Sequence, residues 1–340
     1  MSDLAGRILE RAISGIDGGK RPGQVAMVTA VADSLEEGTH LLVQAGTGTG
    51  KSLGYLAPVL ARIVERGEVI VVATATLALQ AQLAGSDIPA ALDAVEHVAG
   101  QRPRACVLKG RNNYACLFRA RDGSTENGQG TLLGAAELSE SHESGSPSKL
   151  GVEVLMLREW VEEQLLVGGA GDRDEAPPHT AAAWQQVSIP TRECPGVSRC
   201  PFGGECFVER SRESARTADL IVTNHALVAI NAMHGGTALP EHDALIIDEA
   251  HELMGRLTTA ATGELSAGVA ERVVKRCLAW LDDELGGDLL DAVEELHDAL
   301  ADSPTGRITG VDVPLPAACA GLRDASRRAL SELVKDTGQS

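Results

Sequence analysis

The chain has 340 residues, of which 44% are hydrophobic, and a formal net charge of −18. At roughly 150 residues per domain, this length predicts two or three domains with sizeable cores. No apolar run is long enough to span a bilayer, and the N-terminal MSDLAGRILERAISG has acidic residues and no long apolar core of a secretory signal. We therefore expect a cytoplasmic protein that does not bind or span a membrane.

Residues 40–52, HLLVQAGTGTGKS, are the clearest signal of chemistry in the chain. The apolar run Leu41-Leu42-Val43 predicts a short buried strand, and AGTGTGKS fits the phosphate-loop pattern with Ala in place of the first Gly. Small residues let backbone N–H groups turn towards a phosphate chain, and a helix from about Lys51 adds its positive dipole end. A ligand-free glycine turn is the alternative, which the flanking strand, the Lys-Ser pair and the helix disfavour.

Within this loop we expect Lys51 to reach the β- and γ-phosphates of ATP and the Ser52 hydroxyl to ligate Mg²⁺. The predicted nucleotide-binding residues of the loop are Ala45, Gly46, Thr47, Gly48, Thr49, Gly50, Lys51 and Ser52.

Helical and strand patterns alternate along the first 250 residues. Residues 1–40 are predicted to be helical with a break at Arg21-Pro22-Gly23-Gln24, and residues 53–66 form an amphipathic helix. Continuous apolar runs at 69–73, 219–223 and 244–248, with a shorter one at 105–108, predict strands buried in a sheet. Strands that alternate with helices indicate an α/β fold with a parallel sheet.

Asp248-Glu249-Ala250-His251 directly follows the last predicted strand. Carboxylates at the C-terminal edge of a parallel strand lie beside a phosphate loop on a neighbouring strand. We expect Asp248 to hold Mg²⁺ through a water, Glu249 to orient or deprotonate the attacking water, and His251 to relay the nucleotide state. Alone the tetrapeptide could begin a helix by chance, but the phosphate loop upstream favours the catalytic interpretation.

The remaining sequence divides into further segments. Residues 122–149 are rich in Gly, Ser, Glu and Thr and predict a flexible insert, whereas 153–167 is a candidate amphipathic helix. Beyond His251 only helical periodicity is found, with Val269, Val273, Cys277 and Trp280 on one face of the first helix. The last part of the chain is therefore predicted to be a helical unit.

Seven cysteines in a cytoplasmic chain predict metal or cluster ligation rather than disulfides. Cys194, Cys200 and Cys206 recur at a wide spacing in a Gly- and Pro-rich loop, and Cys116 lies far upstream. Zinc sites usually have closer pairs, so this spacing favours an iron–sulfur cluster, with zinc or free thiols as alternatives. The other three, Cys106, Cys277 and Cys319, have apolar neighbours and are expected to be core residues.

The segment 100–121 has six basic residues and no acidic one, which is unusual in so acidic a chain. A local basic segment predicts a nucleic-acid contact, with a solvated loop as the alternative. Aromatic residues lie near the four cysteines. We expect Phe202 and Phe207 to shield a cluster, while Tyr114 and Phe118 could instead stack on bases.

Taken together, these motifs resemble the DinG branch of the XPD-like iron–sulfur superfamily 2 DNA helicases. The resemblance includes the order of the motifs and extends over residues 20–251. The motifs are RPGQ at 21–24, AGTGTGKS at 45–52, Thr74 to Gln80, KGRNNYAC at 109–116, the triple-cysteine loop, ADLIVTNHA at 218–226 and DEAH at 248–251.

The resemblance implies an ATP-dependent 5′–3′ DNA helicase that translocates on single-stranded DNA and unwinds forks or R-loops in repair or replication. By position, Gln24 would contact adenine, and Lys51, Asp248, Glu249 and His251 would act in hydrolysis. Cys116, Cys194, Cys200 and Cys206 would hold a [4Fe-4S] cluster, and Ser52 with Asp248 would hold Mg²⁺. Residues 74–80 and KGRNNY would lie along the DNA.

The same resemblance implies a domain plan. It places a RecA-like P-loop NTPase domain at 1–100 and 217–258, an inserted iron–sulfur domain at 101–216 with its flexible part near 122–150, and a partial helical arch domain at 259–340. No second RecA-like lobe and no Gln-x-x-Gly-Arg motif follow. We therefore expect an N-terminal portion that ends inside the arch.

Two other functions fit part of the pattern. One is a remodeller that translocates on nucleic acid without unwinding it. The other is a truncated nucleic-acid-binding module with a redox-sensing cluster and no complete ATPase.

Overall fold

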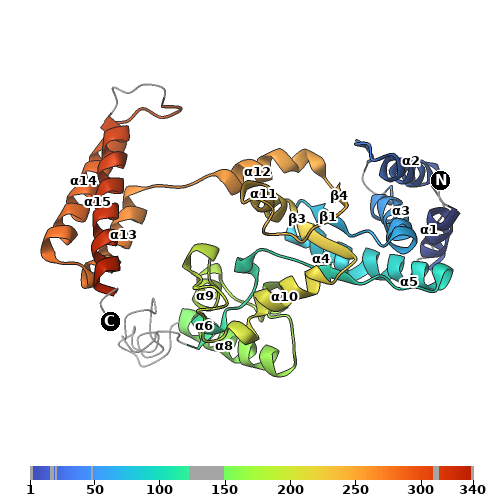
Figure 1. Ribbon diagram of the computed structural model, residues 1–340, viewed down its shortest axis with the longest axis horizontal. Coiled ribbons are helices and arrows are strands. Elements are labelled where there is room, and N and C mark those ends of the chain that lie inside the picture. The colour runs from blue at the N-terminus through green and yellow to red at the C-terminus, as the bar shows by residue number, and fades with distance from the viewer. Residues whose placement is uncertain are drawn as a thin grey trace. The chain divides into compact units, whose positions relative to one another are not determined.

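The computed structural model describes residues 3–15, 19, 21–46, 49–121, 149–308 and 314–337. The chain divides into two compact units, Met1–Ala261 and Thr262–Ser340 (Figure 1). None of the helices in the described parts of the chain is both long and apolar enough to cross a membrane.

The first unit is built on a parallel sheet of four strands in the order β2-β3-β1-β4. The strands are β1 Ile70–Thr74, β2 Ala105–Val107, β3 Leu220–Asn224 and β4 Ala244–Ile247. Val72 of β1 pairs with Val222 of β3 and with Ile246 of β4. The parallel α/β sheet predicted from the apolar runs is confirmed, and the C-terminal ends of its strands share one edge.

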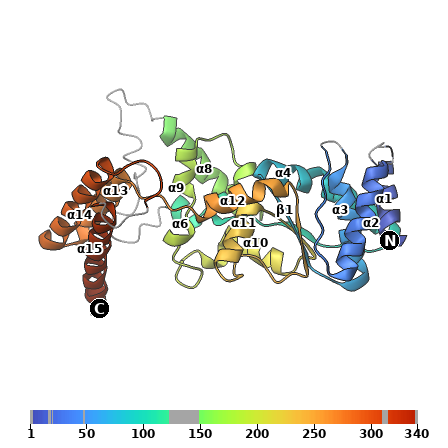
Figure 2. The same ribbon diagram turned by 90° about the horizontal axis from the view of Figure 1, so that it is seen from above.

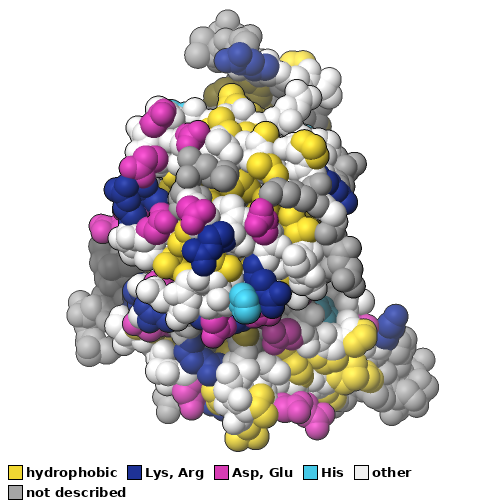
Figure 3. Space-filling model, turned by 90° about the vertical axis from the view of Figure 1, so that its right-hand side faces the viewer, with side chains coloured by type: hydrophobic (Ala, Val, Ile, Leu, Met, Phe, Trp, Pro, Cys, Tyr) yellow, Lys and Arg dark blue, Asp and Glu magenta, His cyan; other side chains and the backbone are white. Residues whose placement is uncertain are grey.

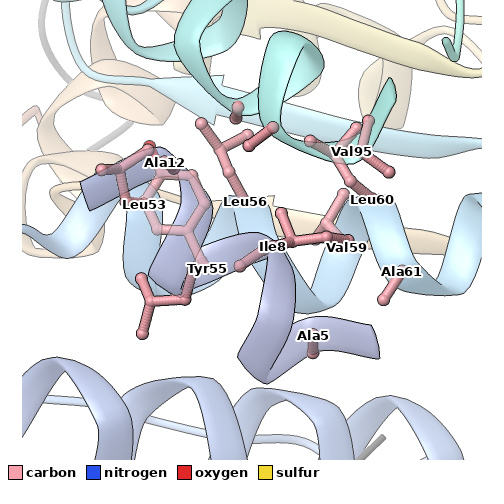
Figure 4. Close-up of a cluster of buried hydrophobic side chains, with 14 of the residues drawn as sticks. Ala5, Ile8, Ala12, Leu53, Tyr55, Leu56, Val59, Leu60, Ala61 and Val95 are labelled. Carbon is pink, nitrogen blue, oxygen red and sulfur yellow. The ribbon is translucent and has the colours of Figure 1, made fainter. Parts of the chain in front are cut away.

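One face of the sheet is covered by α1 Asp3–Gly15, α2 Pro22–Glu37, α3 Lys51–Arg66 and α5 Ile88–Ala99. Figure 4 shows Leu56 and Leu60 of α3 beside Ile8 of α1 and Val95 of α5. Leu56, Leu60 and Ile8 are fully buried, and burying such a side chain contributes about 2 kcal/mol. This core holds the start of α3, and with it Lys51, against the sheet.

The opposite face of the sheet packs on a second apolar cluster that includes Val71, Ile221, Leu108 and Leu227. Its helical cover comes from α10 Phe207–Arg216 and α11 His225–Met233. Beyond β1, Thr76 caps α4 Leu77–Gln82 by accepting a hydrogen bond from the Leu79 N–H at 3.2 Å. A π-helical turn, Leu83–Asp87, then leads into α5.

A separate core forms below the sheet in Figure 1, from residues 114–121 and 149–208. Its helices are α6 Leu117–Ala120, α8 Lys149–Leu166, α9 Ala181–Val187 and the start of α10. Trp160, Trp184 and Phe207 are among its buried side chains. Most of the insert predicted at 122–149 lies outside the described residues, which resume with Lys149 in α8.

The strand predicted at Leu41–Val43 does not form. These residues have no ladder partner, and Leu42 is 94% exposed. In the sheet, β4 is an edge strand whose residues are only half buried. The prediction was wrong because an apolar run shows that a segment favours burial, but not whether a neighbouring strand will pair with it.

The helices beyond β4 are α12 Leu253–Ala261 in the first unit, and α13 Ala267–Cys277, α14 Asp283–Ala301 and α15 Pro314–Thr337 in the second. The second unit has its own core. The predicted apolar face of α13 is corrected: Val273 and Trp280 are each 52% exposed, and Ala270 and Val274 are buried instead. Ala270 and Val274 belong to the core that α13 shares with α14 and α15.

Candidate nucleotide site and cysteine pocket

The phosphate loop leads directly into α3, as its sequence predicts. Gly50 is the N-cap of α3 with φ 79°, a left-handed conformation that favours glycine, and Lys51 and Ser52 begin the helix. The Thr49 hydroxyl donates to the Gly46 carbonyl at 2.9 Å. Thr47 and Gly48 lie outside the described residues.

Gln24, near the start of α2, is 5% exposed and lies against this loop. Its Nε2 donates to the Gly50 carbonyl at 2.9 Å. The amide predicted to contact adenine is therefore held on the backbone at the last glycine before Lys51, which ties α2 to the phosphate loop.

Lys51 and the predicted catalytic carboxylate meet, although 198 positions separate them. The Lys51 Nζ lies 2.5 Å from Glu249 Oε1, and about a quarter of each side chain is exposed. The hydrogen bond from Lys51 lowers the pKa of Glu249. A primary amine and a carboxylate thus face each other at the C-terminal edge of the sheet.

Asp248 is fixed by both its backbone and its carboxylate. Its N–H donates to the Ala73 carbonyl at 2.8 Å, which continues the ladder beyond β4. Its Oδ2 lies 3.3 Å from the hydroxyl of Tyr55 in α3. Burial and then the charge of Asp248 raise the pKa of Tyr55, while a hydrogen bond from Ser52 works in the opposite direction. The two predicted Mg²⁺ ligands, Ser52 and Asp248, therefore share Tyr55 as a neighbour.

His251 is placed differently from the two carboxylates. Its side chain is 71% exposed, with Nδ1 3.5 Å from Glu249 Oε2 and Nε2 3.7 Å from Glu252 Oε1. The imidazole therefore lies at the surface beside Glu249, where a further partner can reach it.

Sequence reasoning included His225, the first residue of α11, in the motif at 218–226 but gave it no role. It is fully buried, and its Nε2 lies 2.8 Å from the Asp248 carbonyl oxygen. Burial is the main cause that lowers the pKa of its imidazole. The signal was its position directly after β3, at the sheet edge that also holds Asp248.

The four cysteines predicted to act together line one pocket. Cys116 precedes α6, and Cys194, Cys200 and Cys206 come from the loop before α10. The rest of the wall is largely apolar and includes Phe118, Phe202, Ile189 and Val208. The structure thus brings together thiols from two segments nearly 80 positions apart, beside aromatic side chains.

The thiols differ in their contacts. Burial raises the pKa of Cys116 to about 11, opposed by hydrogen bonds from the N–H groups of Arg119 and Phe118. Arg111 Nη1 donates to Cys194 Sγ at 3.3 Å. In the described part of the chain, no three Cys, His, Asp or Glu side chains are arranged to hold a single metal ion. The four thiols therefore line one pocket but are not arranged as the ligands of one metal ion.

The basic segment 100–121 does not form a free basic surface. Each of its six cations has a carboxylate partner: Arg102 with Asp93 and Glu96, Arg104 with Asp219, Lys109 with Asp172 and Asp174, Arg111 with Glu209, Arg119 with Glu193, and Arg121 with Glu162 and Glu205. On the face in Figure 3, basic and acidic side chains are likewise interspersed. The acidic partners come from other parts of the sequence, so the local charge count overstated the positive surface.

Three residues of the predicted DNA path are buried. Gln80 is fully buried and its Nε2 donates to the Val222 carbonyl at 3.0 Å. Lys109 is 6% exposed, and Tyr114 is 3% exposed with its hydroxyl 2.7 Å from Ser211 Oγ. These side chains make contacts inside the protein. In this structure the Tyr114 ring is buried and cannot stack on a base.

A parallel sheet with a phosphate-loop sequence that opens α3, and a DEAH sequence at the same edge, is typical of P-loop nucleotide-binding proteins. Residues 21–100 match the DEAD/DEAH box helicase family.

Longer similarities identify the branch. The chain is 40% identical over 306 residues to the "ATP-dependent helicase DinG" of Mycobacterium tuberculosis, which covers 90% of this chain and 45% of that protein. It is 32% identical over 249 residues to the "ATP-dependent DNA helicase YoaA" of Escherichia coli, 72% of this chain and 35% of that protein. A Bacillus subtilis relative, "3'-5' exonuclease DinG", is 27% identical over 246 residues, 71% of this chain and 24% of that protein.

The chain is therefore DinG-like over most of its length, as its motifs predicted. It spans less than half the length of these relatives.

Proposed function

We propose that this chain is the nucleotide-binding and cluster-binding part of an ATP-dependent 5′–3′ DNA helicase. The observation that supports it best is the meeting of Lys51 and Glu249 at 2.5 Å, since these residues come from the two motifs on which ATP hydrolysis depends. The names of the mycobacterial and Escherichia coli relatives agree with a helicase.

In this proposal each residue has a defined role in ATP hydrolysis. Lys51 exchanges its contact with Glu249 for the β- and γ-phosphates, and Ser52 and Asp248 hold Mg²⁺ beside them. Glu249, released from Lys51, accepts a proton from the attacking water. Gln24 positions the loop near the adenine, and the exposed His251 contacts a neighbouring domain.

The proposed cluster is [4Fe-4S], held by Cys116, Cys194, Cys200 and Cys206. Four thiols around one largely apolar pocket fit the donor set of such a cluster. The wide spacing of Cys194, Cys200 and Cys206 in the sequence favours a cluster over zinc, whose ligand pairs are usually closer. A bound cluster would cross-link the loop before α10 to the segment before α6.

The proposed partner is single-stranded DNA at forks or R-loops. RecA-like motors hydrolyse ATP between two lobes, and the second lobe supplies an arginine that stabilises the transition state. We therefore expect these 340 residues alone to bind Mg·ATP weakly and to turn it over very slowly. A full-rate, DNA-stimulated ATPase from this chain alone would contradict this part of the proposal.

Titration with a fluorescent ATP analogue and Mg²⁺ tests the nucleotide site. The Lys51→Ala variant should weaken binding at least about tenfold, because it removes the cation that faces the phosphates. Lys275→Ala is the matched control, since Lys275 is an exposed helical lysine paired with Glu271 at 2.7 Å. Equal binding by both variants would reject the nucleotide site.

Iron and acid-labile sulfide assays on anaerobically prepared protein test the cluster. Cys200→Ser should lose most of the iron, whereas Cys319→Ser should keep it because Cys319 packs on the core of the second unit. Colourless wild-type protein that contains zinc and no iron would reject the cluster.

A further inference from the structure

Glu249 has an unusual backbone. Its φ of 52° is the one positive value among the non-glycine residues that the structure describes. A left-handed conformation costs about 1–2 kcal/mol for a residue with a Cβ atom, so it persists only where neighbouring contacts hold it. The contacts that hold the Asp248–Glu249 peptide therefore decide where the Glu249 carboxylate points.

Both sides of this peptide are held. The Glu249 N–H donates to Asp248 Oδ1 at 3.0 Å, and the Asp248 N–H is fixed by Ala73. The Asp248 carbonyl is 2.8 Å from His225 Nε2, on a different element, α11. A rotation of the peptide would break the His225 contact and would swing the Glu249 side chain away from Lys51.

The state of the imidazole follows from its partners. A carbonyl oxygen can only accept, so His225 Nε2 must carry the hydrogen. Its Nδ1 is buried and has no hydrogen-bond partner. The Nε2–H group thus donates to the Asp248 carbonyl, with the Ala73 backbone as a further neighbour, in a fully buried position where solvent cannot replace it.

We propose that His225 is a positioning residue that aims the Glu249 carboxylate through the Asp248 carbonyl. The inference rests on the proposed function of Glu249. It also gives the β3–α11 junction a role, because a shift of α11 would change the orientation of the peptide that joins the two carboxylates. Lys51 and its loop are held by other contacts, so His225 should affect turnover more than nucleotide binding.

Three variants test this proposal. His225→Leu has a similar volume and no donor, and His225→Gln carries an amide N–H near the position of Nε2. Thr223→Val is the matched control, because it removes a buried hydrogen bond, 2.9 Å long, from Thr223 Oγ1 to the carbonyl of Leu108, the residue directly after β2. Single-turnover ATP hydrolysis, analogue affinity and thermal unfolding are measured for each.

We expect His225→Leu to hydrolyse ATP at least about tenfold more slowly than Thr223→Val, with analogue affinity within about twofold of wild type. His225→Gln should recover most of the rate. Equal rates in His225→Leu and wild type, or an equal loss in Thr223→Val, would overturn the proposal. If the Leu variant does not fold, His225→Asn replaces it, because its shorter amide cannot reach the carbonyl.

A second readout does not need turnover. Acetylation of Lys51, followed by mass spectrometry, reports how far Glu249 protects the amine. His225→Leu should raise the Lys51 labelling rate at least about threefold, and Thr223→Val and His225→Gln should not. Unchanged labelling in the Leu variant rejects the inference, whereas a wild-type protein that neither binds nor hydrolyses ATP rejects the proposed function.

Discussion

Gly50 is favoured at its position for two reasons, its backbone conformation and the lack of space for a side chain. Its φ of 79° favours glycine, and a Cβ atom there would lie 2.4 Å from Gln24 Nε2. At Gly67, which ends α3 with φ 70°, a Cβ atom would meet no other atom within 4 Å. The two positions therefore share the backbone strain but not the steric conflict.

We predict that Gly67→Ala lowers the free energy of unfolding by about 1 kcal/mol, from backbone strain alone. Gly50→Ala should lose a similar amount and should also weaken binding of the ATP analogue, because Gln24 must leave the Gly50 carbonyl. Urea denaturation and analogue titration measure the two effects. Equal analogue affinity in both variants would show that the Gln24 contact does not shape the loop.

Site residues could be predicted from the sequence where they belong to one contiguous motif. Lys51, Asp248 and Glu249 belong to contiguous patterns tied to a strand or helix end, and the structure brings them together. The motif at 218–226 includes His225 but did not reveal its role, because that role depends on a contact with Asp248, 23 positions away. Cys116 lines the same pocket as Cys194, Cys200 and Cys206, as the number of thiols suggested, but their role as ligands stays a prediction.

At the scale of elements, Lys109 links the sheet to the cysteine-bearing part. It follows β2 and its Nζ lies 2.5 Å from Asp172 and 2.7 Å from Asp174, in the segment after α8. Burial alone would lower the pKa of Lys109, but the hydrogen bonds to the two carboxylates outweigh it and raise the pKa. The ammonium is thus a buried cation between two segments.

We predict that Lys109→Met lowers the free energy of unfolding by about 2–3 kcal/mol, because Asp172 is left partly buried without its partner. The exposed pairs of Arg102 are the comparison, and Arg102→Met should cost less than about 1 kcal/mol. Urea denaturation at low and high salt measures both. A cost for Lys109→Met no larger than that for Arg102→Met would show that this contact does not hold the two parts together.

Glu153 of α8 joins the start of α9 in the same way. Its Oε2 accepts from the Thr180 hydroxyl at 2.7 Å and from the Thr180 N–H at 2.8 Å, and these bonds lower its pKa. Because the folded protein holds the ionised form, the stabilisation is present above about pH 4.5 and is lost as the pH falls further.

We predict that Glu153→Gln lowers stability at pH 7 and flattens the decline of stability between about pH 5 and 3. Glu159→Gln, an exposed glutamate on the same helix, should leave the pH profile unchanged. Denaturant titrations across this pH range measure the slopes. Parallel profiles for wild type and Glu153→Gln would show that the Thr180 hydrogen bonds do not favour the ionised form.

Helices and strands were predictable from apolar patterns where the segment packs against other elements in the fold. The strands at β1, β2, β3 and β4 were found because each lies within the sheet. Leu41–Val43 was assigned wrongly because its pairing depends on a tertiary neighbour. The positive charge of the basic segment was overestimated because its counter-charges come from positions such as Asp219 and Glu162. Neither kind of partner is visible in a local window.

At the scale of the whole molecule, the apolar clusters respect the boundary at Ala261. Three of them, on the two faces of the sheet and around the cysteine pocket, use residues of the first unit only. The fourth joins α13, α14 and α15 within the second unit. Figure 2 shows α13, α14 and α15 packed on one another within the second unit. Each unit therefore has a core that forms without the other.

We predict that residues 1–261 fold alone and bind the ATP analogue with an affinity within about twofold of the whole chain, because Lys51, Asp248, Glu249 and His225 all belong to this unit. Because all four proposed cluster ligands lie in this fragment, it should hold as much iron as the whole chain. Calorimetry of the whole chain should then show two transitions, one of which matches the fragment. A fragment that is folded but binds the analogue about tenfold more weakly would mean that the helical unit contributes directly to the nucleotide site. An unfolded fragment would mean that the three apolar clusters are insufficient, and that the boundary at Ala261 separates two parts of one cooperative domain.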